Sequence, residues 1–102
     1  MITTASREDV RSETRIGFHG PMVLSSVSKL NKILEDSGSP DGEKVQHIWY
    51  GKLNDHILFT VYDYKEDHLL GVDEETWFHI GSKDLASAIE VSTALDEALK
   101  QV

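Results

Sequence analysis

Two segments rich in β-branched and aromatic residues, separated by only two residues, constrain the fold more than any other feature of this sequence. Val45 to Leu53 and His56 to Tyr64 flank Asn54-Asp55. A link of two residues between such segments is typical of a tight β-hairpin. The centre of the chain is therefore predicted to be an antiparallel strand pair.

The length of the turn decides which side chains share a face of this hairpin. A two-residue turn places Tyr50 opposite Phe59, Ile48 opposite Val61 and His47 opposite Tyr62. One face is then mostly apolar and suited to be covered by helices; it carries Ile48, Tyr50, Ile57, Phe59 and Val61. The other face is an aromatic surface with polar tips; it carries Val45, His47, Trp49, Leu58, Tyr62 and Tyr64.

Further strands and helices are predicted on both sides of the hairpin. Arg15 to His19 alternates and ends at Gly20-Pro21, which indicates a short strand. Thr76 to Gly81 indicates another, with Phe78 and Ile80 toward the core and Trp77 and His79 on the other side. Helical spacing connects Val23, Val27, Leu30 and Leu34. A last helix is capped by Ser82 and buries Leu85, Ala88, Ile89, Ser92, Leu95, Leu99 and Val102.

The predicted architecture is a single α+β domain with the order β-α-β-β-β-α, an antiparallel sheet with two helices packed on one face. We expect this domain to span residues 15–102. Residues 1–14 are polar with isolated apolar positions, so we expect them to form a flexible N-terminal arm.

Charge is distributed unevenly along the chain. The net charge is -8, and residues 54–102 hold eleven acidic residues against three lysines. Nucleic-acid affinity depends on cations that neutralise phosphates, so direct nucleic-acid binding is not expected. A protein with a basic surface is the expected partner. Without cysteine or a long apolar run, the sequence predicts a cytoplasmic protein with no disulfide and no membrane contact.

The candidate site combines the aromatic sheet face with the acidic loop that follows the hairpin, Lys65 to Glu75. Aromatic rings with polar tips suit a partner protein, a second copy of the chain or a stacked base. Alternatively, the arm or the loop covers this face as a second minor core. The candidate binding residues are His47, Trp49, Tyr62, Trp77, His79, Glu66, Asp67, Asp73, Glu74 and Glu75.

No catalytic or cofactor signature stands out in the sequence. The five histidines, with Asp63 as a further candidate ligand, lack a recognised ligand spacing, so no metal site is predicted. No nucleophile, base and orienting group can be assembled into one set. We therefore expect a protein that is not an enzyme and has no cofactor.

Two resemblances bear on function. From residue 22 onward the predicted element order looks like that of double-stranded RNA-binding domains, but Ser82-Lys83-Asp84 stands where that family has a basic cluster. The segments Phe59 to Tyr64 and Trp77 to Gly81 resemble a pattern in short, mostly uncharacterised tailed-bacteriophage accessory proteins. This chain departs from that pattern at Ser82, where a second glycine is expected, and in its longer acidic loop. The resemblance implies a small protein that antagonises a host enzyme or immune system in the host cytoplasm.

The leading hypothesis is a phage-type accessory protein that inhibits a host defence or nucleic-acid-processing factor. It would bind through the acidic surface and the aromatic face. One alternative is a sponge that sequesters a small nucleotide signal, such as a cyclic one, by stacking its base on aromatic rings. Another is a structural module that forms a homodimer.

Overall fold

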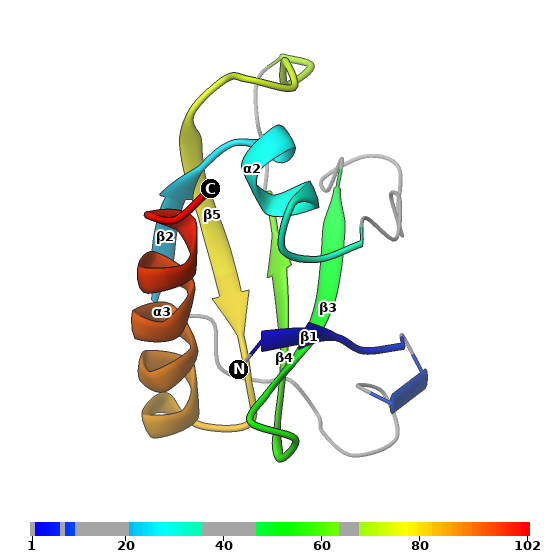
Figure 1. Cartoon of the computed structure of the whole chain (residues 1–102), viewed down its shortest axis with the longest axis vertical. Coiled ribbons are helices and arrows are strands. Elements are labelled where there is room, and N and C mark those ends of the chain that lie inside the picture. Colours follow the sequence, from blue (N-terminus) through cyan, green and yellow to red (C-terminus); the bar gives the residue numbers. More distant parts are fainter. Residues whose placement is uncertain (1, 7, 10–20, 36–46, 64–67) are drawn as a thin grey trace.

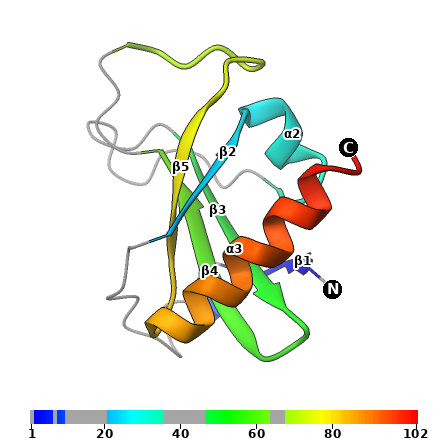
Figure 2. The same cartoon turned by 90° about the vertical axis from the view of Figure 1, so that its left-hand side faces the viewer.

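The computed structural model describes residues 2–6, 8–9, 21–35, 47–63 and 68–102. The elements are β1 (Ile2–Thr4), β2 (Met22–Ser25), α2 (Val27–Asn31), β3 (Ile48–Leu53), β4 (Ile57–Tyr62), β5 (Thr76–Gly81) and α3 (Leu85–Leu99). The strands form one antiparallel sheet in the order β1-β3-β4-β5-β2. Helices α2 and α3 lie on the same face of this sheet (Figures 1 and 2). The predicted α+β class is confirmed, and the strand predicted at 15–19 lies outside the described residues.

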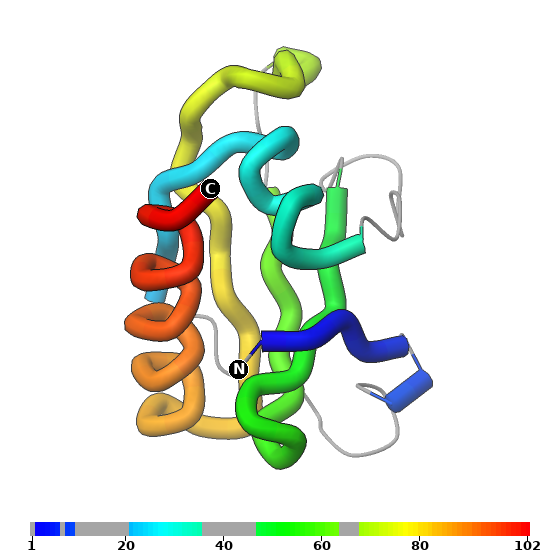
Figure 3. Tube along the Cα trace, viewed as in Figure 1, coloured from blue at the N-terminus to red at the C-terminus, as the bar shows by residue number. Residues whose placement is uncertain are grey.

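The beginning of the chain is part of the sheet, so the prediction of a flexible arm is wrong for Ile2–Thr4. These residues form β1 and pair with β3, with Ile2 opposite Leu53. Figure 3 shows the blue start of the trace meeting the green trace of β3. The contact continues past the strand, where the Ala5 amide donates to the Tyr50 carbonyl at 2.9 Å. Ile2 packs against the main core. A three-residue edge strand is too short to show a periodicity, which is why the sequence did not reveal it.

The predicted first helix starts later than expected because its first turn is a strand. Met22–Ser25 form β2 and pair with β5, and α2 follows with Ser26 as its N-cap. The Ser26 hydroxyl accepts a hydrogen bond from the Lys29 amide at 3.3 Å. Val23 is buried in the same core as α2, so the apolar spacing is real but spans two elements. Alternating burial along β2 turns Val23 toward the core, where a helical stripe would also place it.

The hairpin turn has three residues, which shifts the predicted pairing by one position. Leu53 pairs with Ile57, Tyr50 with Thr60 and Trp49 with Val61. The left-handed region holds Asn54 at φ 53° and Asp55 at φ 66°. Asn and Asp enter this region at lower cost than other side chains, because their short polar groups hydrogen-bond locally.

A one-residue shift moves every side chain of one strand to the opposite face of the sheet. Phe59 and Val61 face the core as predicted, but their neighbours across the strand pair are Gly51 and Trp49. Tyr50, predicted to be a core residue, lies in a second small cluster. The prediction that Trp49 faces away from the helices is therefore wrong.

The main core lies between the sheet and the two helices. It combines three buried aromatic side chains, Trp49, Phe59 and Phe78, with aliphatic residues from β2, α2, β5 and α3. Trp49 meets Phe78 edge to face, with ring centroids 5.6 Å apart. Its indole Nε1 donates to Asn31 Oδ1 at 2.9 Å, so the polar atom is satisfied by α2. Phe78 and Ile80 are buried as predicted.

Gly51 is required by the position of the Phe59 ring. A Cβ atom on Gly51 would lie 2.3 Å from Phe59 Cζ and 2.8 Å from each Cε atom. The ring therefore covers the backbone of the opposite strand where a side chain would otherwise stand. This close approach fixes the register from the core side.

Helix α3 begins two residues later than predicted and rotates a different stripe toward the sheet. Its N-cap is Asp84, whose carboxylate accepts from the Ser87 amide at 2.8 Å. Ser82 instead donates its hydroxyl to the Leu58 carbonyl. The buried positions are Ser87, Ala88, Val91 and Leu95. Leu85 and Ile89 are exposed, contrary to prediction.

None of the helices in the described part of the chain is both long enough and apolar enough to cross a membrane.

Candidate functional site

The predicted aromatic face does not exist as one surface, because the hairpin register separates its members. Trp49 lies in the main core and is fully buried. His47 stacks on Trp49, with ring centroids 5.8 Å apart. Tyr62, Trp77 and His79 lie on the opposite face of the sheet, and Tyr62 stacks on His79 at 5.5 Å. Of the five residues of the predicted aromatic face, two therefore lie on the core side of the sheet and three lie on its outer face.

Part of the outer sheet face is covered, as one of the predicted alternatives allowed. Tyr50 and Leu58 are buried there in a small cluster with Ala5, and Ile48 packs against it. This region over β3 and β4 offers little surface to a partner. The open part of the outer face lies further along the sheet, at β5 and β2.

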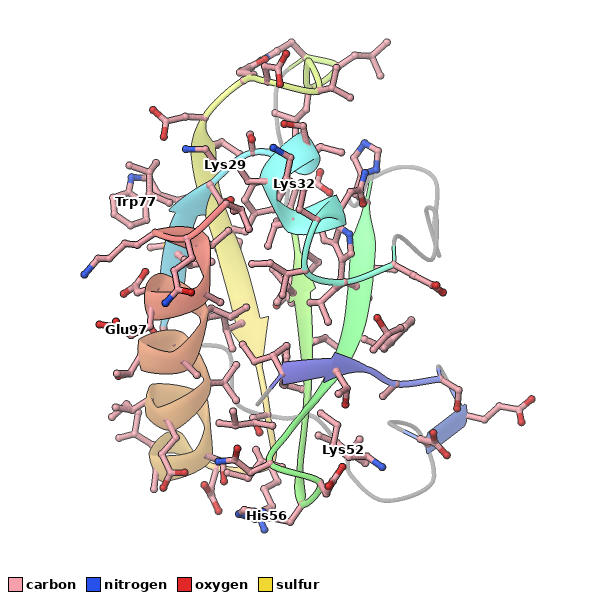
Figure 4. The ribbon with its side chains drawn as sticks, viewed as in Figure 1. Lys29, Lys32, Lys52, His56, Trp77 and Glu97 are labelled. Carbon is pink, nitrogen blue, oxygen red and sulfur yellow. The ribbon has the colours of Figure 1, made fainter. Side chains whose placement is uncertain are left out.

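Three large apolar side chains are exposed at the β2 side of the sheet: Met22, Leu24 and Trp77, which we call the edge patch. Their exposed fractions are 46%, 46% and 55%. Leu24 lies directly opposite Trp77 in the strand pairing, and Met22 lies opposite His79. Figure 4 shows Trp77 projecting outward at the side of the molecule where β2 and α3 lie.

The sheet itself positions the edge patch. Side chains alternate along β2, so Val23 and Ser25 turn into the protein while Met22 and Leu24 turn out. The same alternation in β5 buries Phe78 and Ile80 and leaves Trp77 outside. The rigid backbone ladder therefore presents the three exposed side chains in fixed relative positions.

Two of the described carboxylates of the acidic loop, Asp73 and Glu75, hold that loop against α2. Asp73 accepts from the Ser28 hydroxyl at 2.9 Å, and Glu75 forms an ion pair with Lys29 at 3.8 Å. Glu74 contacts His68 Nε2 through one oxygen and accepts from the Gly71 amide at 3.2 Å through the other. These carboxylates contribute charge to the surface while their oxygens engage the protein's own groups. Glu66 and Asp67 lie outside the described residues.

A groove next to the edge patch separates β2 and α2 from the end of α3. It has a volume of about 420 Å³ and is lined by Leu24, Lys29, Asp96, Leu99, Lys100 and Val102. Figure 4 shows Lys29 on α2. Lys29 and Lys100 each pair with a glutamate, Glu75 and Glu97, at 3.8 Å. The groove therefore mixes apolar walls with locally balanced charges.

Asp63 has a structural role that the sequence did not suggest. It is fully buried after β4, and its Oδ1 accepts from the His47 amide at 2.7 Å. The carboxylate thus ties the residue before β3 to the end of β4. Within the described residues, no group of three or more His, Asp or Glu side chains is placed to hold a metal ion.

The sequence did not predict Met22 and Leu24, which are two of the three residues of the edge patch. Their neighbours Val23 and Val27 fit a helical stripe, and that spacing masked the alternation of Met22 to Ser25. The preceding Pro21 was a usable signal, because proline is tolerated at the start of an edge strand. Trp77 was predicted on the outer face, and this placement is confirmed.

Comparison of the chain with protein-family models, with curated proteins and with solved structures gives no match.

Proposed function

We propose that this protein is a non-enzymatic binding protein that acts by occupying the surface of a partner protein through the edge patch. The observation that carries the proposal is the exposure of Met22, Leu24 and Trp77 side by side on two paired strands. Large contiguous apolar groups at a protein surface mark interaction sites more often than isolated ones do. Tryptophan and methionine are also enriched at protein interfaces.

The size of the edge patch is sufficient for a specific anchor. Fully burying a large apolar side chain contributes about 1.5 to 3 kcal/mol, and each of these three is about half exposed. Covering all three would therefore contribute about 3 kcal/mol, or roughly a hundredfold in affinity. Such a contribution is typical of the buried centre of an interface, around which polar contacts add specificity.

The net charge of -8 supports a partner with a basic surface. Opposite charges on two proteins accelerate their encounter, and salt screens this effect. We infer that the negative field guides the approach, while the edge patch holds the complex. Met22 and Leu24, and not the buried Trp49, accompany Trp77 on this binding surface.

The bacteriophage resemblance supplies a biological setting for the same proposal. It implies that the partner is a host defence or nucleic-acid-processing factor and that the encounter takes place in the host cytoplasm. A binding protein inhibits such a factor by occupancy alone, so no catalytic group is needed. The identity of the host factor follows from the capture experiment below.

The test is affinity capture from a bacterial lysate with matched variants. Leu24→Ser combined with Trp77→Ser removes the patch, while Leu69→Ser removes one exposed apolar side chain elsewhere, since Leu69 is 87% exposed. We expect one or more proteins to be retained by the wild type and by Leu69→Ser but released by the patch variant. Circular dichroism and thermal melting confirm that each variant folds. Equal retention by all three proteins, or retention of nothing, would contradict the proposal.

A further inference from the structure

The backbone of β2 has hydrogen-bonding groups that point away from the sheet. In an antiparallel pair, alternate residues exchange hydrogen bonds with the partner strand, and the residues between them point to the other side. The Ile80 amide donates to the Pro21 carbonyl at 3.1 Å, so Pro21, Val23 and Ser25 face β5. The N–H and C=O groups of Met22 and Leu24 therefore face the outer edge.

This outer edge is open within the described part of the chain. Among the described strands, β2 is the last in the sheet order and pairs with β5 alone. No other described residue exchanges a backbone hydrogen bond with Met22 or Leu24. Figure 2 looks toward this edge, with β2 in front of the other strands and α3 beside it. Two donors and two acceptors thus stand in a row, spaced two residues apart.

An open strand edge is a template for another strand, and proteins usually protect it with charge, proline or a covering segment. The sequence of β2, Met-Val-Leu-Ser, contains no charged residue. The two residues with outward backbone groups are also the two with exposed apolar side chains. The outward backbone groups and the exposed apolar side chains of β2 therefore both suit an extended polypeptide segment.

We propose that the partner binds by adding an extended segment to the edge of β2 as a sixth strand. This inference rests on the proposed function, because it states how the edge patch is used. The main chain of the segment would bond the N–H and C=O groups of Met22 and Leu24, as in strand addition elsewhere. Its side chains on the outer face would pack beside Leu24 and extend the row that begins with Trp77.

Charge defines the chemistry of this segment. The chain as a whole carries a net charge of -8, whereas in the groove beside β2 Lys29 and Lys100 pair with Glu75 and Glu97, so the attraction comes from the overall negative field. The matching segment has apolar residues at alternate positions and lysine or arginine at its ends. A second copy of this chain fits less well, since it would bring two chains of the same large negative charge together.

The experiment selects peptides from a random displayed library on the immobilised full-length protein. We expect enriched peptides to alternate β-branched or aromatic residues with polar ones and to end in basic residues. Amide hydrogen exchange, followed by NMR on the complex with the enriched peptide, then measures the protection of each backbone amide of β2. The amides of Met22 and Leu24 should become at least tenfold more protected, whereas those of Val23 and Ser25, which face β5, change little.

Two variants separate backbone from side-chain contributions. Leu24→Pro removes the outward N–H without removing a bond to β5 and should abolish peptide binding, while Leu24→Ala keeps the N–H and should weaken binding about fivefold. Thermal melting shows whether each variant folds. If Leu24→Pro does not fold, the exchange pattern of the wild type decides alone.

The outcomes distinguish this inference from the function on which it rests. Peptides that need Trp77 for binding but leave the Met22 and Leu24 amides exchanging freely would overturn strand addition and keep the edge patch as a binding site. Absence of any peptide whose binding needs Trp77 would overturn both. Protection of the same two amides without peptide, growing with protein concentration, would show that a second copy occupies the edge and would overturn the partner assignment.

Discussion

Replacement of Gly51 by alanine tests the register on which the assignment of inner and outer faces depends. In the structure, Gly51 lies opposite Phe59, and an added Cβ would stand 2.3 Å from Phe59 Cζ. An ordinary contact between carbon atoms is about 3.5 to 4.0 Å, so the ring must move by more than about 1 Å. Phe59 is fully buried, which leaves the ring no open space to enter.

The magnitude follows from the cost of overpacking a core. Extra methyl groups in a well-packed interior cost about 1 to 3 kcal/mol, and the severity of this contact places Gly51→Ala toward the upper end. Replacing glycine in a strand returns about 0.5 to 1 kcal/mol of backbone entropy. We therefore expect Gly51→Ala to lower the free energy of unfolding by about 1 to 2 kcal/mol.

A double-mutant cycle shows whether the Phe59 ring is the cause. Phe59→Leu removes the Cε and Cζ atoms that the new methyl group would meet, at a cost of its own for the cavity. In that background Gly51→Ala should be neutral or stabilising, giving a coupling energy of about 1 to 2 kcal/mol. The measurement is urea unfolding followed by tryptophan fluorescence, with a constant m-value as the check on two-state behaviour.

Additive effects of Gly51→Ala and Phe59→Leu would contradict this register. With a two-residue turn, Gly51 would lie opposite Leu58, and an alanine there would not meet Phe59. If Gly51→Ala is neutral alone, or if its effect is the same in the wild-type and in the Phe59→Leu background, the three-residue turn is wrong. The burial of Trp49 and the edge patch would then need to be reassigned.

The tryptophans, the hairpin turn and the cap of α3 each allow a further test. In Trp77→Phe the remaining Trp49 should fluoresce at short wavelength and resist acrylamide quenching, because it is buried. In Trp49→Phe the exposed Trp77 should be quenched readily, and similar quenching in both variants would contradict the burial of Trp49. Asp55→Gly should change the free energy of unfolding by less than about 0.5 kcal/mol, but Asp55→Val should lower it by about 1 kcal/mol or more, because a β-branched residue strains a positive φ. Urea unfolding of both variants checks this, and equal stability of the two would contradict the left-handed turn. The hydrogen bond from the Ser87 amide lowers the pKa of Asp84 in the folded protein below its usual value of 3.8. The ionised cap therefore stabilises the fold at pH values above 3.8, and this stabilisation is lost as the pH falls through the lower pKa of the folded state. Urea unfolding of wild type and Asp84→Asn at pH 7 and pH 3 should therefore show a smaller pH dependence for the variant, and equal pH dependence would count against a charged cap.

Local patterns in the sequence were sufficient for the elements that are regular and self-contained. Alternation in Thr76 to Gly81 placed Phe78 and Ile80 inside and Trp77 outside, because each residue of a strand faces opposite to the next. The hairpin was recognisable from its two β-rich segments and the short link between them. The charge of the chain, which supports the proposed class of partner, is a property of composition alone.

Which face of the hairpin is buried, and where the sheet ends, depend on long-range packing. Asn54-Asp55 permits a turn of two or of three residues, and the choice depends on fitting the Phe59 ring over Gly51 and Trp49 beneath α2. Met22 to Ser25 satisfied a helical spacing and an alternating one equally, until pairing with β5 made it a strand. Long-range packing selects among local conformations of similar energy. For that reason the outward-facing backbone groups of Met22 and Leu24 were not visible in the sequence.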